Sequence, residues 1–466
     1  MSKHTHGRVR GQVGRTCRQL FEDQELCFGR LLPVAKVQQA LDRHGVRFRR
    51  CLYTPLVTLW TFLCQVLGAD QCCRAAVARL LAWLGLHDAE PCSGKTDPYC
   101  KARDRLPEAL IADLARSSGQ ELQQQVPATG LLQGRPIKLA DGTTVSMPDT
   151  PANQQSYPQP DSQQAGLGFP LLRLVALISL SCGAVLDVAM GAYAGKQTGE
   201  TSLLRQMLSG LRAGDVLLAD SCFGNYWTIA LLRGRGVDVV SRHDGKRRVD
   251  FGGGRRLGRL DHVVSWPKPT CPDWMEQSLY QSLPEQLHIR ELRVAVYQRG
   301  FRVRWMLLIT TLVDAGAFSQ AQLAEVYRLR WHAELDIRCI KVAMRMDVLR
   351  CKTAAMVRKE IRMHLLAYNL VRKLMAQAAA TAQVDPRQLS FKGAMQTVSA
   401  FAAAGVIAEP SKSQALYQAI LKAVASHRVG DRPDRSEPRA VKRRPKGLPR
   451  LQQPRAVAKA RLLQRS

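Results

Sequence analysis

The order of strand and helix patterns in the middle of the chain limits the folds that it can adopt. Three strand-like runs come first, followed in turn by a helix, a strand, a helix and a strand: RPIKLADGTTVSM, LLRLVALISL, VLDVAMGAYA, GETSLLRQMLSGL, DVLLAD, YWTIALLRGRG and VDVVSR. The turn signal SCGA separates the second and third runs, so they predict a hairpin of buried strands. The order β-β-β-α-β-α-β predicts an α/β fold class over residues 131–242, with a mixed sheet flanked by helices.

The segments on either side of this region lack the same alternation. Residues 1–130 carry helical patterns with short breaks, which predict a helical N-terminal region. Residues 243–318 hold Gly- and Arg-rich turns and two strand patterns, LRVAVYQR and RVRWMLLITTL, which are typical of an all-β, or at least β-rich, insertion. Helical patterns return over residues 319–385, which would complete the α/β region begun by residues 131–242, and over the C-terminal residues 386–466. The basic end of the chain, beyond Gly430, is expected to be disordered until it meets an anion.

The overall charge favours a polyanionic partner. The chain has 68 Lys and Arg against 38 Asp and Glu, a formal charge of +30. Such a balance favours nucleic acid, with an anionic membrane surface as the lesser alternative.

The 13 cysteines are scattered without a C-x-x-C pair, so we expect reduced thiols and a cytoplasmic, nucleoid-associated protein.

One uncharged stretch, Cys51–Ala69, is about long enough to cross a bilayer. Polar residues dilute it, and Thr54 and Pro55 have the residue types that begin a helix, at the N-cap and N1 positions. We therefore expect a buried helix here rather than a membrane span.

The stretch AEVYRLRWHAELDIRCIKVAMRM, residues 324–346, places a glutamate among cations and aromatics. As one continuous helix from about Ser319, it would place four side chains on one face: Tyr327, Arg330, Glu334 and Lys341. An apolar stripe beside them predicts a helix packed on the core: Val326, Leu329, Ala333, Ile337, Ile340 and Met344. The simplest interpretation of Arg330 and Glu334 is an exposed i,i+4 ion pair.

Two aspartates make a second interpretation of Glu334 possible. Asp141 and Asp220 are each predicted at the end of a strand, where ligands collect in open α/β sheets, although such residues are equally often turn formers. Carboxylate oxygens are the ligands that Mg²⁺ prefers, and two such ions can drive phosphodiester cleavage. Three converging acids on a basic protein therefore suggest a metal site for Asp141, Asp220 and Glu334, with Arg330 and Lys341 positioned to hold phosphates.

These residues carry a resemblance to a known family. Tyr327, Arg330, Glu334 and Lys341 match the Y-(2)-R-(3)-E-(6)-K signature of bacterial insertion-sequence transposases of the DDE type, in the insertion-sequence-four family. The sequences LADGTTV and LLADSCFGNY, around Asp141 and Asp220, resemble that family's first and second acidic regions. The similarity covers about half of the chain, roughly residues 135–375.

The resemblance implies a fold, a reaction and a set of roles. The fold would be an RNase H-like catalytic core interrupted by a β-rich insertion. The reaction would be Mg²⁺-dependent cleavage at the ends of a mobile element, with Mn²⁺ able to substitute, followed by joining of the 3′-hydroxyl to target DNA. Asp141, Asp220 and Glu334 would hold the metals, and three residues would grip phosphates: Tyr327, Arg330 and Lys341.

Three further side chains near the signature have open roles. In relatives that use a DNA hairpin, a tryptophan in the insertion stacks on a flipped base, and Trp305 resembles it in position. The alternative is that Trp305 fills the core of the insertion. Trp331 is predicted to pack, and His332 to be a solvated helix residue.

The partners follow from the same comparison. We expect double-stranded DNA, both element ends and target, and a homodimer that holds the two ends together, with no membrane. Residues 1–130 would recognise the ends. Two alternatives remain: a catalytically silent DNA-binding protein on the same scaffold, and a metal-dependent nuclease that cuts without joining.

Overall fold

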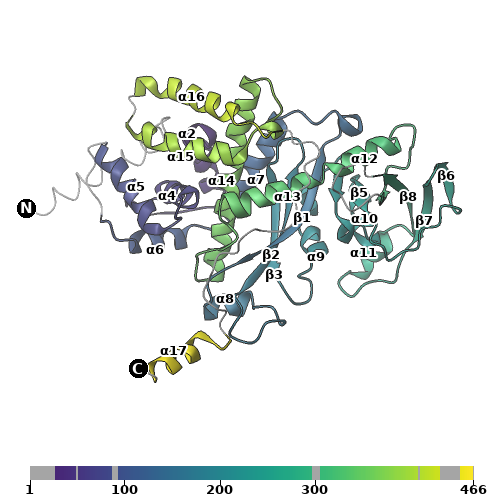
Figure 1. Ribbon diagram of the computed structural model, residues 1–466, viewed down its shortest axis with the longest axis horizontal. Helices are drawn as coiled ribbons and strands as arrows, with labels where there is room; N and C mark the ends of the chain where they lie inside the picture. Colours follow the sequence, from purple (N-terminus) through teal and green to yellow (C-terminus); the bar gives the residue numbers. More distant parts are fainter. Residues whose placement is uncertain are drawn as a thin grey trace, which may run out of the picture.

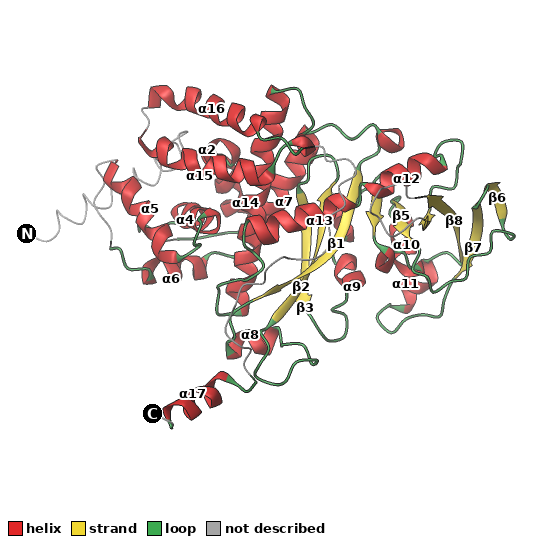
Figure 2. Cartoon of the chain, in the orientation of Figure 1, coloured by secondary structure: helices red, strands yellow, loops and turns green. Residues whose placement is uncertain are grey.

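The computed structural model describes residues 27–48, 51–86, 93–295, 305–407, 410–430 and 452–464 of the chain. A long sheet runs through the molecule, and helices cover both of its faces (Figures 1 and 2). Helices from the two ends of the sequence, except the last one, gather at one end of the sheet, and the strands of the predicted insertion lie at the other. The mixed α/β class predicted from the sequence is confirmed.

The sheet has nine described strands in the order β3-β2-β1-β4-β5-β9-β8-β7-β6. The first five are β1 (Ile137–Ser146), β2 (Leu171–Ser179), β3 (Val185–Ala192), β4 (Val216–Ala219) and β5 (Asp238–Arg242). β2 pairs antiparallel with both β1 and β3, which confirms the predicted hairpin, whereas β1, β4 and β5 run parallel. The parallel strands therefore share one carboxyl edge, where a ligand site is expected.

The insertion lengthens this sheet. Its strands are β6 (Arg255–Gly258), β7 (Asp261–Pro267), β8 (Gln286–Ala295) and β9 (Trp305–Thr310), and β9 pairs antiparallel with β5. Pairing satisfies the edge of β5, which would otherwise expose unpaired backbone groups. The prediction of an all-β insertion was wrong in one respect, because the short helix α11 (Gln277–Ser282) lies between β7 and β8.

Two apolar layers hold helices against the sheet. On one face, side chains of α9 (Glu200–Arg205) and α10 (Tyr226–Arg233) pack against inward residues such as Ala140 and Leu217. On the other face, Leu139 and Leu218 belong to the larger core that includes α14 (Ala354–Thr381). Because successive strand residues point to opposite faces, each strand contributes to both layers.

The chain has further helices at both ends, and several of them contact α14. The N-terminal ones are α2 (Cys27–Leu31), α3 (Val34–Arg43), α4 (Pro55–Leu67), α5 (Cys73–Leu86), α6 (Asp97–Arg105) and α7 (Glu108–Gln125), and the sheet region adds α8 (Pro151–Ser156). The C-terminal ones are α15 (Phe391–Ile407), α16 (Ser413–Ser426) and α17 (Arg455–Leu463). α7 packs along α14, and Asn369 of α14 donates hydrogen bonds to Ala115 O and Val185 O. The N-terminal helices thus share a core with the sheet, and the domain boundary at residue 130 stays a prediction.

Two sequence predictions for the terminal regions have clear outcomes. Thr54 caps α4 by accepting a hydrogen bond from Val57 N, Pro55 occupies N1, and most of the helix is buried, as predicted. No helix among the described residues has the length and apolar character needed to cross a membrane. The prediction of a disordered tail was wrong for α17, a helix with no buried residue, while residues 431–451 lie outside the described part of the chain.

The helix that carries Glu334 is divided into three pieces. α12 (Gln320–Arg328) begins at Ser319 with a capping box, α13 (Trp331–Arg338) follows, and the π-helical turn η4 (Cys339–Ala343) continues it. The single continuous helix predicted from the sequence was therefore wrong at Leu329–Arg330 and at η4. The apolar stripe nevertheless packs on the core, with Leu329 only partly buried. π-helical turns occur mostly as short insertions, often at functional sites.

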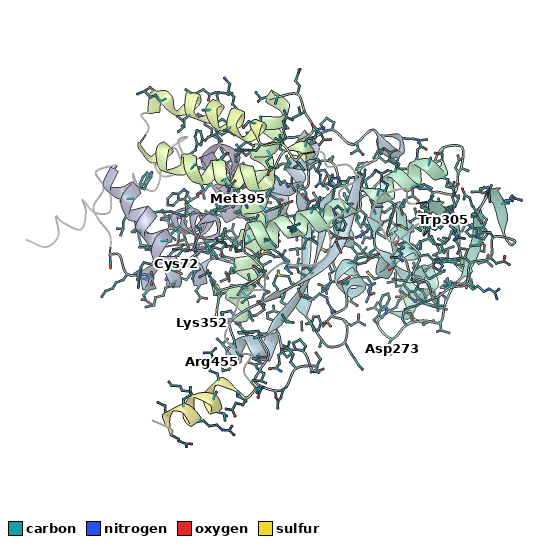
Figure 3. The ribbon with its side chains drawn as sticks, viewed as in Figure 1. Cys72, Asp273, Trp305, Lys352, Met395 and Arg455 are labelled. Atoms are coloured by element: carbon teal, nitrogen blue, oxygen red, sulfur yellow. The ribbon has the colours of Figure 1, made fainter. Side chains whose placement is uncertain are left out.

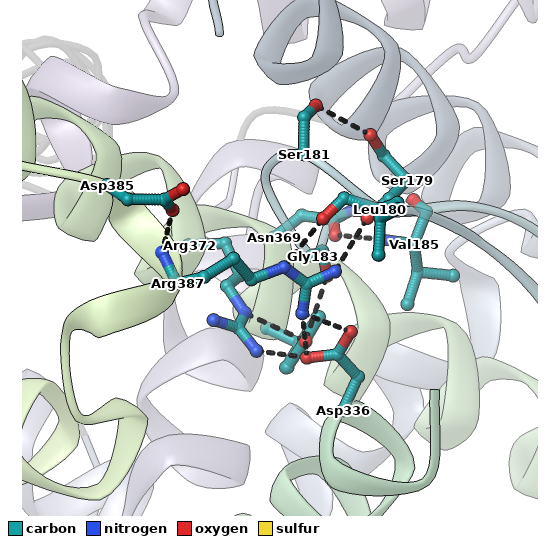
Figure 4. Close-up of polar contacts among 11 residues, drawn as sticks. Ser179, Leu180, Ser181, Gly183, Val185, Asp336, Asn369, Arg372, Asp385 and Arg387 are labelled. Atoms are coloured by element: carbon teal, nitrogen blue, oxygen red, sulfur yellow. Dashed lines mark hydrogen bonds and ion pairs between the residues drawn. The ribbon is translucent and has the colours of Figure 1, made fainter. Parts of the chain in front are cut away.

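A buried ion cluster fixes α13 in place (Figure 4). Asp336 is fully buried and accepts hydrogen bonds from Arg372 of α14 and from Arg387, whose Nη1 lies 2.7 Å from Asp336 Oδ2. Arg387 also donates to Ser179 O and Leu180 O, both at 2.8 Å, at the end of β2. The cluster therefore joins α13, α14 and the β2–β3 hairpin. Its carboxylate, Asp336, lies two residues after Glu334 in α13.

We predict that Asp336→Ala destabilises the protein by about 3–5 kcal/mol, because it leaves two guanidinium groups poorly compensated in the interior. Equilibrium unfolding in urea measures this loss. The control is Glu325→Ala on the exposed face of α12, which should change the unfolding free energy by less than about 0.5 kcal/mol. Equal stabilities for the two variants would show that the cluster does not hold the helix.

Candidate active site

The register of the parallel strands brings Asp141 and Asp220 side by side. Ile137 to Ala140 of β1 pair with Val216 to Ala219 of β4, so the next residues along the two strands are Asp141 and Asp220. Neighbouring strands lie about 4.8 Å apart. The prediction that Asp141 ends its strand was wrong, because β1 continues to Ser146 beside β2. Since β4 stops at Ala219, Asp141 still lies level with the carboxyl end of β4.

Both aspartates point toward the helix that carries Glu334. Side chains alternate along a strand, so Asp141 shares a face with Leu139, and Asp220 with Leu218. Those leucines belong to the same apolar core as Ala333 and Ile337 of α13. α13 also contacts β1 directly, and it crosses that face of the sheet in Figure 1.

Arg330 connects two of the three acids. Its Nη2 donates a hydrogen bond to Glu334 Oε1 at 2.6 Å, and its Nη1 lies 3.9 Å from Asp141 Oδ2. Because one planar guanidinium reaches both groups, these carboxylate oxygens lie within about 9 Å of each other. The predicted i,i+4 pair of Arg330 and Glu334 is present, but its guanidinium also faces the sheet.

The remaining signature residues lie around the same point. Lys341 Nζ donates to Thr143 Oγ1 at 3.1 Å, and Thr143 is two residues beyond Asp141 on the same face of β1. Tyr327 is buried, and burial raises its pKa to about 12. Asp220 lies near enough to influence the pKa of Tyr327 and that of Arg330. Tyr327, Arg330, Glu334 and Lys341 thus gather, as predicted, despite the interrupted helix.

The Asp141 carboxylate has less compensating positive charge than its burial requires. Burial raises the pKa of Asp141 to about 6, and the negative charges of Glu334 and Glu200 add to this effect. The N–H of Gly142 and the charge of Arg330 oppose the rise without cancelling it. A divalent cation would stabilise the ionised form, and carboxylates are the donors that hard cations prefer. The donor set therefore fits a hard divalent cation.

The side chains are not arranged as a closed metal site. Within the part of the chain that the structure describes, no three His, Cys, Asp or Glu side chains lie close enough together to hold a metal ion. The Arg330 guanidinium stands between Asp141 and Glu334. Metal binding therefore requires these side chains to rearrange.

Two tryptophans that could have been buried, Trp305 and Trp331, are both exposed. Trp305 begins β9, and its side chain is 49% exposed with Arg293 stacked over the ring, so the alternative that it fills the insertion core is wrong. Since Arg242 pairs with Leu308, Trp305 extends past the carboxyl end of β5, toward the edge that carries the aspartates, and Figure 3 labels it among the side chains at that end of the molecule. Trp331 is 52% exposed, so the prediction that it packs was wrong. His332 is only partly exposed, and burial lowers its pKa.

Sequence reasoning missed a fourth carboxylate. Glu200, the first residue of α9, lies against Gly142, where any Cβ would collide with the Glu200 carboxylate. Glu200 Oε2 also accepts from Cys222 Sγ at 3.5 Å, and Cys222 is two residues after Asp220. Glu200 therefore contacts the segments that follow both aspartates. A glycine within a strand pattern often marks such a close approach, and that was the available signal.

Comparisons with known proteins agree with this geometry. Residues 132–370 match the family model described as the Transposase DDE domain. The chain is 26% identical over 351 residues to the Transposase InsG for insertion sequence element IS4 of Escherichia coli (strain K12), covering 74% of this chain and 76% of that protein.

A solved structure of a piggyBac transposase synaptic complex with hairpin DNA is also similar, at 11% identity and a TM-score of 0.44, over 88% of this chain and 87% of that one. A similarity of that size does not establish a shared fold. The family model covers more than half of this chain, and the curated relative spans most of it. The chain therefore belongs to the family of DDE transposases of bacterial insertion sequences, in the insertion-sequence-four group.

Proposed function

We propose that this transposase binds the terminal inverted repeats of its own insertion sequence, cleaves the DNA there, and joins the freed 3′-hydroxyl to target DNA. The sheet order and the helices on both faces are compatible with an RNase H-like core, which we propose as the catalytic scaffold. When bound between the acids, two Mg²⁺ ions would activate the attacking oxygen and stabilise the leaving oxygen of the phosphodiester.

One observation carries this proposal. The parallel register places Asp141 beside Asp220, and the same guanidinium contacts both Asp141 and Glu334. Three acids that are 79 and 114 residues apart in sequence thus converge at the carboxyl edge of a parallel sheet. We assign them as metal ligands, because a partly desolvated carboxylate group on a strongly basic chain fits a cationic cofactor better than a structural role.

The cations around the acids are assigned to the DNA backbone. Lys341 lies over β1 near Asp141, and Arg330 presents a planar fork that suits a phosphate. Tyr327 is held beneath them, where its hydroxyl stays neutral at physiological pH. Trp305 is exposed beyond the same sheet edge and is assigned to base stacking, which an unchanged hairpin yield from pre-nicked DNA in Trp305→Ala would contradict.

The competing functions make different demands on the site. A silent DNA-binding protein needs the charge of +30 but gains nothing from three carboxylates gathered at one edge of the sheet. A nuclease without joining needs the same acids, and the signature around Glu334 is the feature that favours joining. We also propose that the N-terminal helices contribute to end recognition, and that two copies act together, because two ends must be held in one complex.

We predict that Asp141→Asn, Asp220→Asn and Glu334→Gln each lower the cleavage rate by at least about a thousandfold, because each removes a ligand that stabilises the transition state by several kcal/mol. The substrate is a duplex with the inverted repeat found beside the gene, and cleavage is followed by gel electrophoresis. Asp161→Asn, in an exposed turn, is the matched control and should cut normally. Near-normal cleavage by any of the three variants, with DNA binding intact, would remove that residue from the site.

We predict that Lys341→Ala weakens end binding and lowers the slope of log affinity against log salt by about one, since one phosphate contact is lost. Fluorescence anisotropy over a range of salt concentrations measures both quantities. Lys422→Ala, which removes an exposed lysine from α16, should leave the slope unchanged. The phosphate role of Lys341 fails if the two variants have the same slope.

A further inference from the structure

The position of Arg330 is the most informative feature of the site that the assigned roles do not explain. The guanidinium donates to Glu334 at 2.6 Å and lies 3.9 Å from Asp141, and Asp220 is close enough to contribute to the raised pKa of Arg330. Its side chain is only 17% exposed. The Arg330 guanidinium therefore serves as the counter-ion of these carboxylates in the absence of DNA.

A divalent cation and this guanidinium compete for the same oxygens. Glu334 Oε1 cannot ligate a metal while it accepts the short hydrogen bond from Arg330, and Asp141 would face two cations at close range. Since like charges in a low-dielectric site repel strongly, the two occupants exclude each other. With Arg330 in this position, no three His, Cys, Asp or Glu side chains among the described residues are gathered as a metal site.

The local structure allows the Arg330 side chain to move away from Glu334 and Asp141. Arg330 lies at the junction between α12 and α13, and it makes no side-chain capping bond to the first turn of α13. Its partner Glu334 is one turn away, with a side chain that is 38% exposed, so the pair faces an open edge. Arg330 is not a member of the apolar stripe, so its side chain is not one of those that pack α12 and α13 on the core. A DNA phosphate at this edge would offer the guanidinium an alternative bidentate partner.

We propose that Arg330 closes the carboxylate site to divalent cations in the DNA-free protein, and that a DNA phosphate opens it by drawing the guanidinium away. This inference rests on the proposed function, because it assumes that Asp141 and Glu334 are metal ligands. Phosphate engagement and metal binding then strengthen each other by the same factor, as linked equilibria must. The protein would bind its metals only where DNA is present, which would limit cleavage by unengaged copies.

The test is the affinity of the full-length, DNA-free protein for Mn²⁺, measured by isothermal titration calorimetry. We predict that Arg330→Ala and Arg330→Gln bind Mn²⁺ at least about tenfold more tightly than the unaltered protein, because a competing ion pair is gone. The matched control is Arg338→Ala, which removes an equal charge from the exposed face of the same helix and should leave the affinity unchanged. Thermal unfolding checks that the variants are folded.

A second arm uses sulfate as a phosphate mimic, with ionic strength matched by sodium chloride. Sulfate should raise the Mn²⁺ affinity of the unaltered protein toward that of Arg330→Ala and should not change that of Arg330→Ala. Equal Mn²⁺ affinities for Arg330→Ala, Arg330→Gln and the unaltered protein would overturn the inference while leaving the metal site intact. If instead Asp141→Asn does not reduce Mn²⁺ binding in the Arg330→Ala background, the metal assignment in the proposed function fails as well.

Discussion

The buried contact between Asp336 and two arginines holds in place the helix that carries Glu334. α13 is only two turns long and is interrupted on both sides, so its own backbone hydrogen bonds do not fix its position. Arg372 brings α14 to Asp336, and Arg387 extends the contact to the backbone at the end of β2. An ion cluster of this kind adds little net stability, but it strongly penalises any arrangement in which one partner is missing. Because Glu334 lies two residues before Asp336 in the same helix, the contact also holds the backbone of Glu334 in place.

The sheet supplies the other half of the geometry. β1 is longer than β4, and the difference places Asp141 within a strand while Asp220 lies just beyond one. The two carboxylates therefore have different surroundings, since Asp141 has strand partners on one side and Glu200 near its neighbour Gly142. α13 then covers the face toward which both aspartates point. A rigid sheet edge and an anchored helix together position three acids that the chain brings from distant segments.

The fold and the site could be predicted from the sequence to different extents. Apart from the short helix α8, whose six residues carry no apolar period, the order of strands and helices over residues 135–242 followed from hydrophobic patterns and turn signals, as did the hairpin. The joining of β9 to β5 did not, since strand pairing across an insertion depends on which edge is left open. The break at Leu329–Arg330 was also missed, because local propensity continues through it. Asp336 was missed because its partners lie 36 and 51 residues further along the chain.

In the proposed mechanism, Asp141, Asp220 and Glu334 jointly hold two divalent cations when DNA is engaged. Crystals of the protein with a duplex carrying its element end, grown with Mn²⁺ and measured for anomalous scattering, would test it directly. We predict two anomalous peaks about 4 Å apart, ligated by these three carboxylates, with Arg330 turned to a phosphate. Peaks ligated by other residues, or Arg330 still bridging Asp141 and Glu334 in a DNA-bound complex, would contradict it.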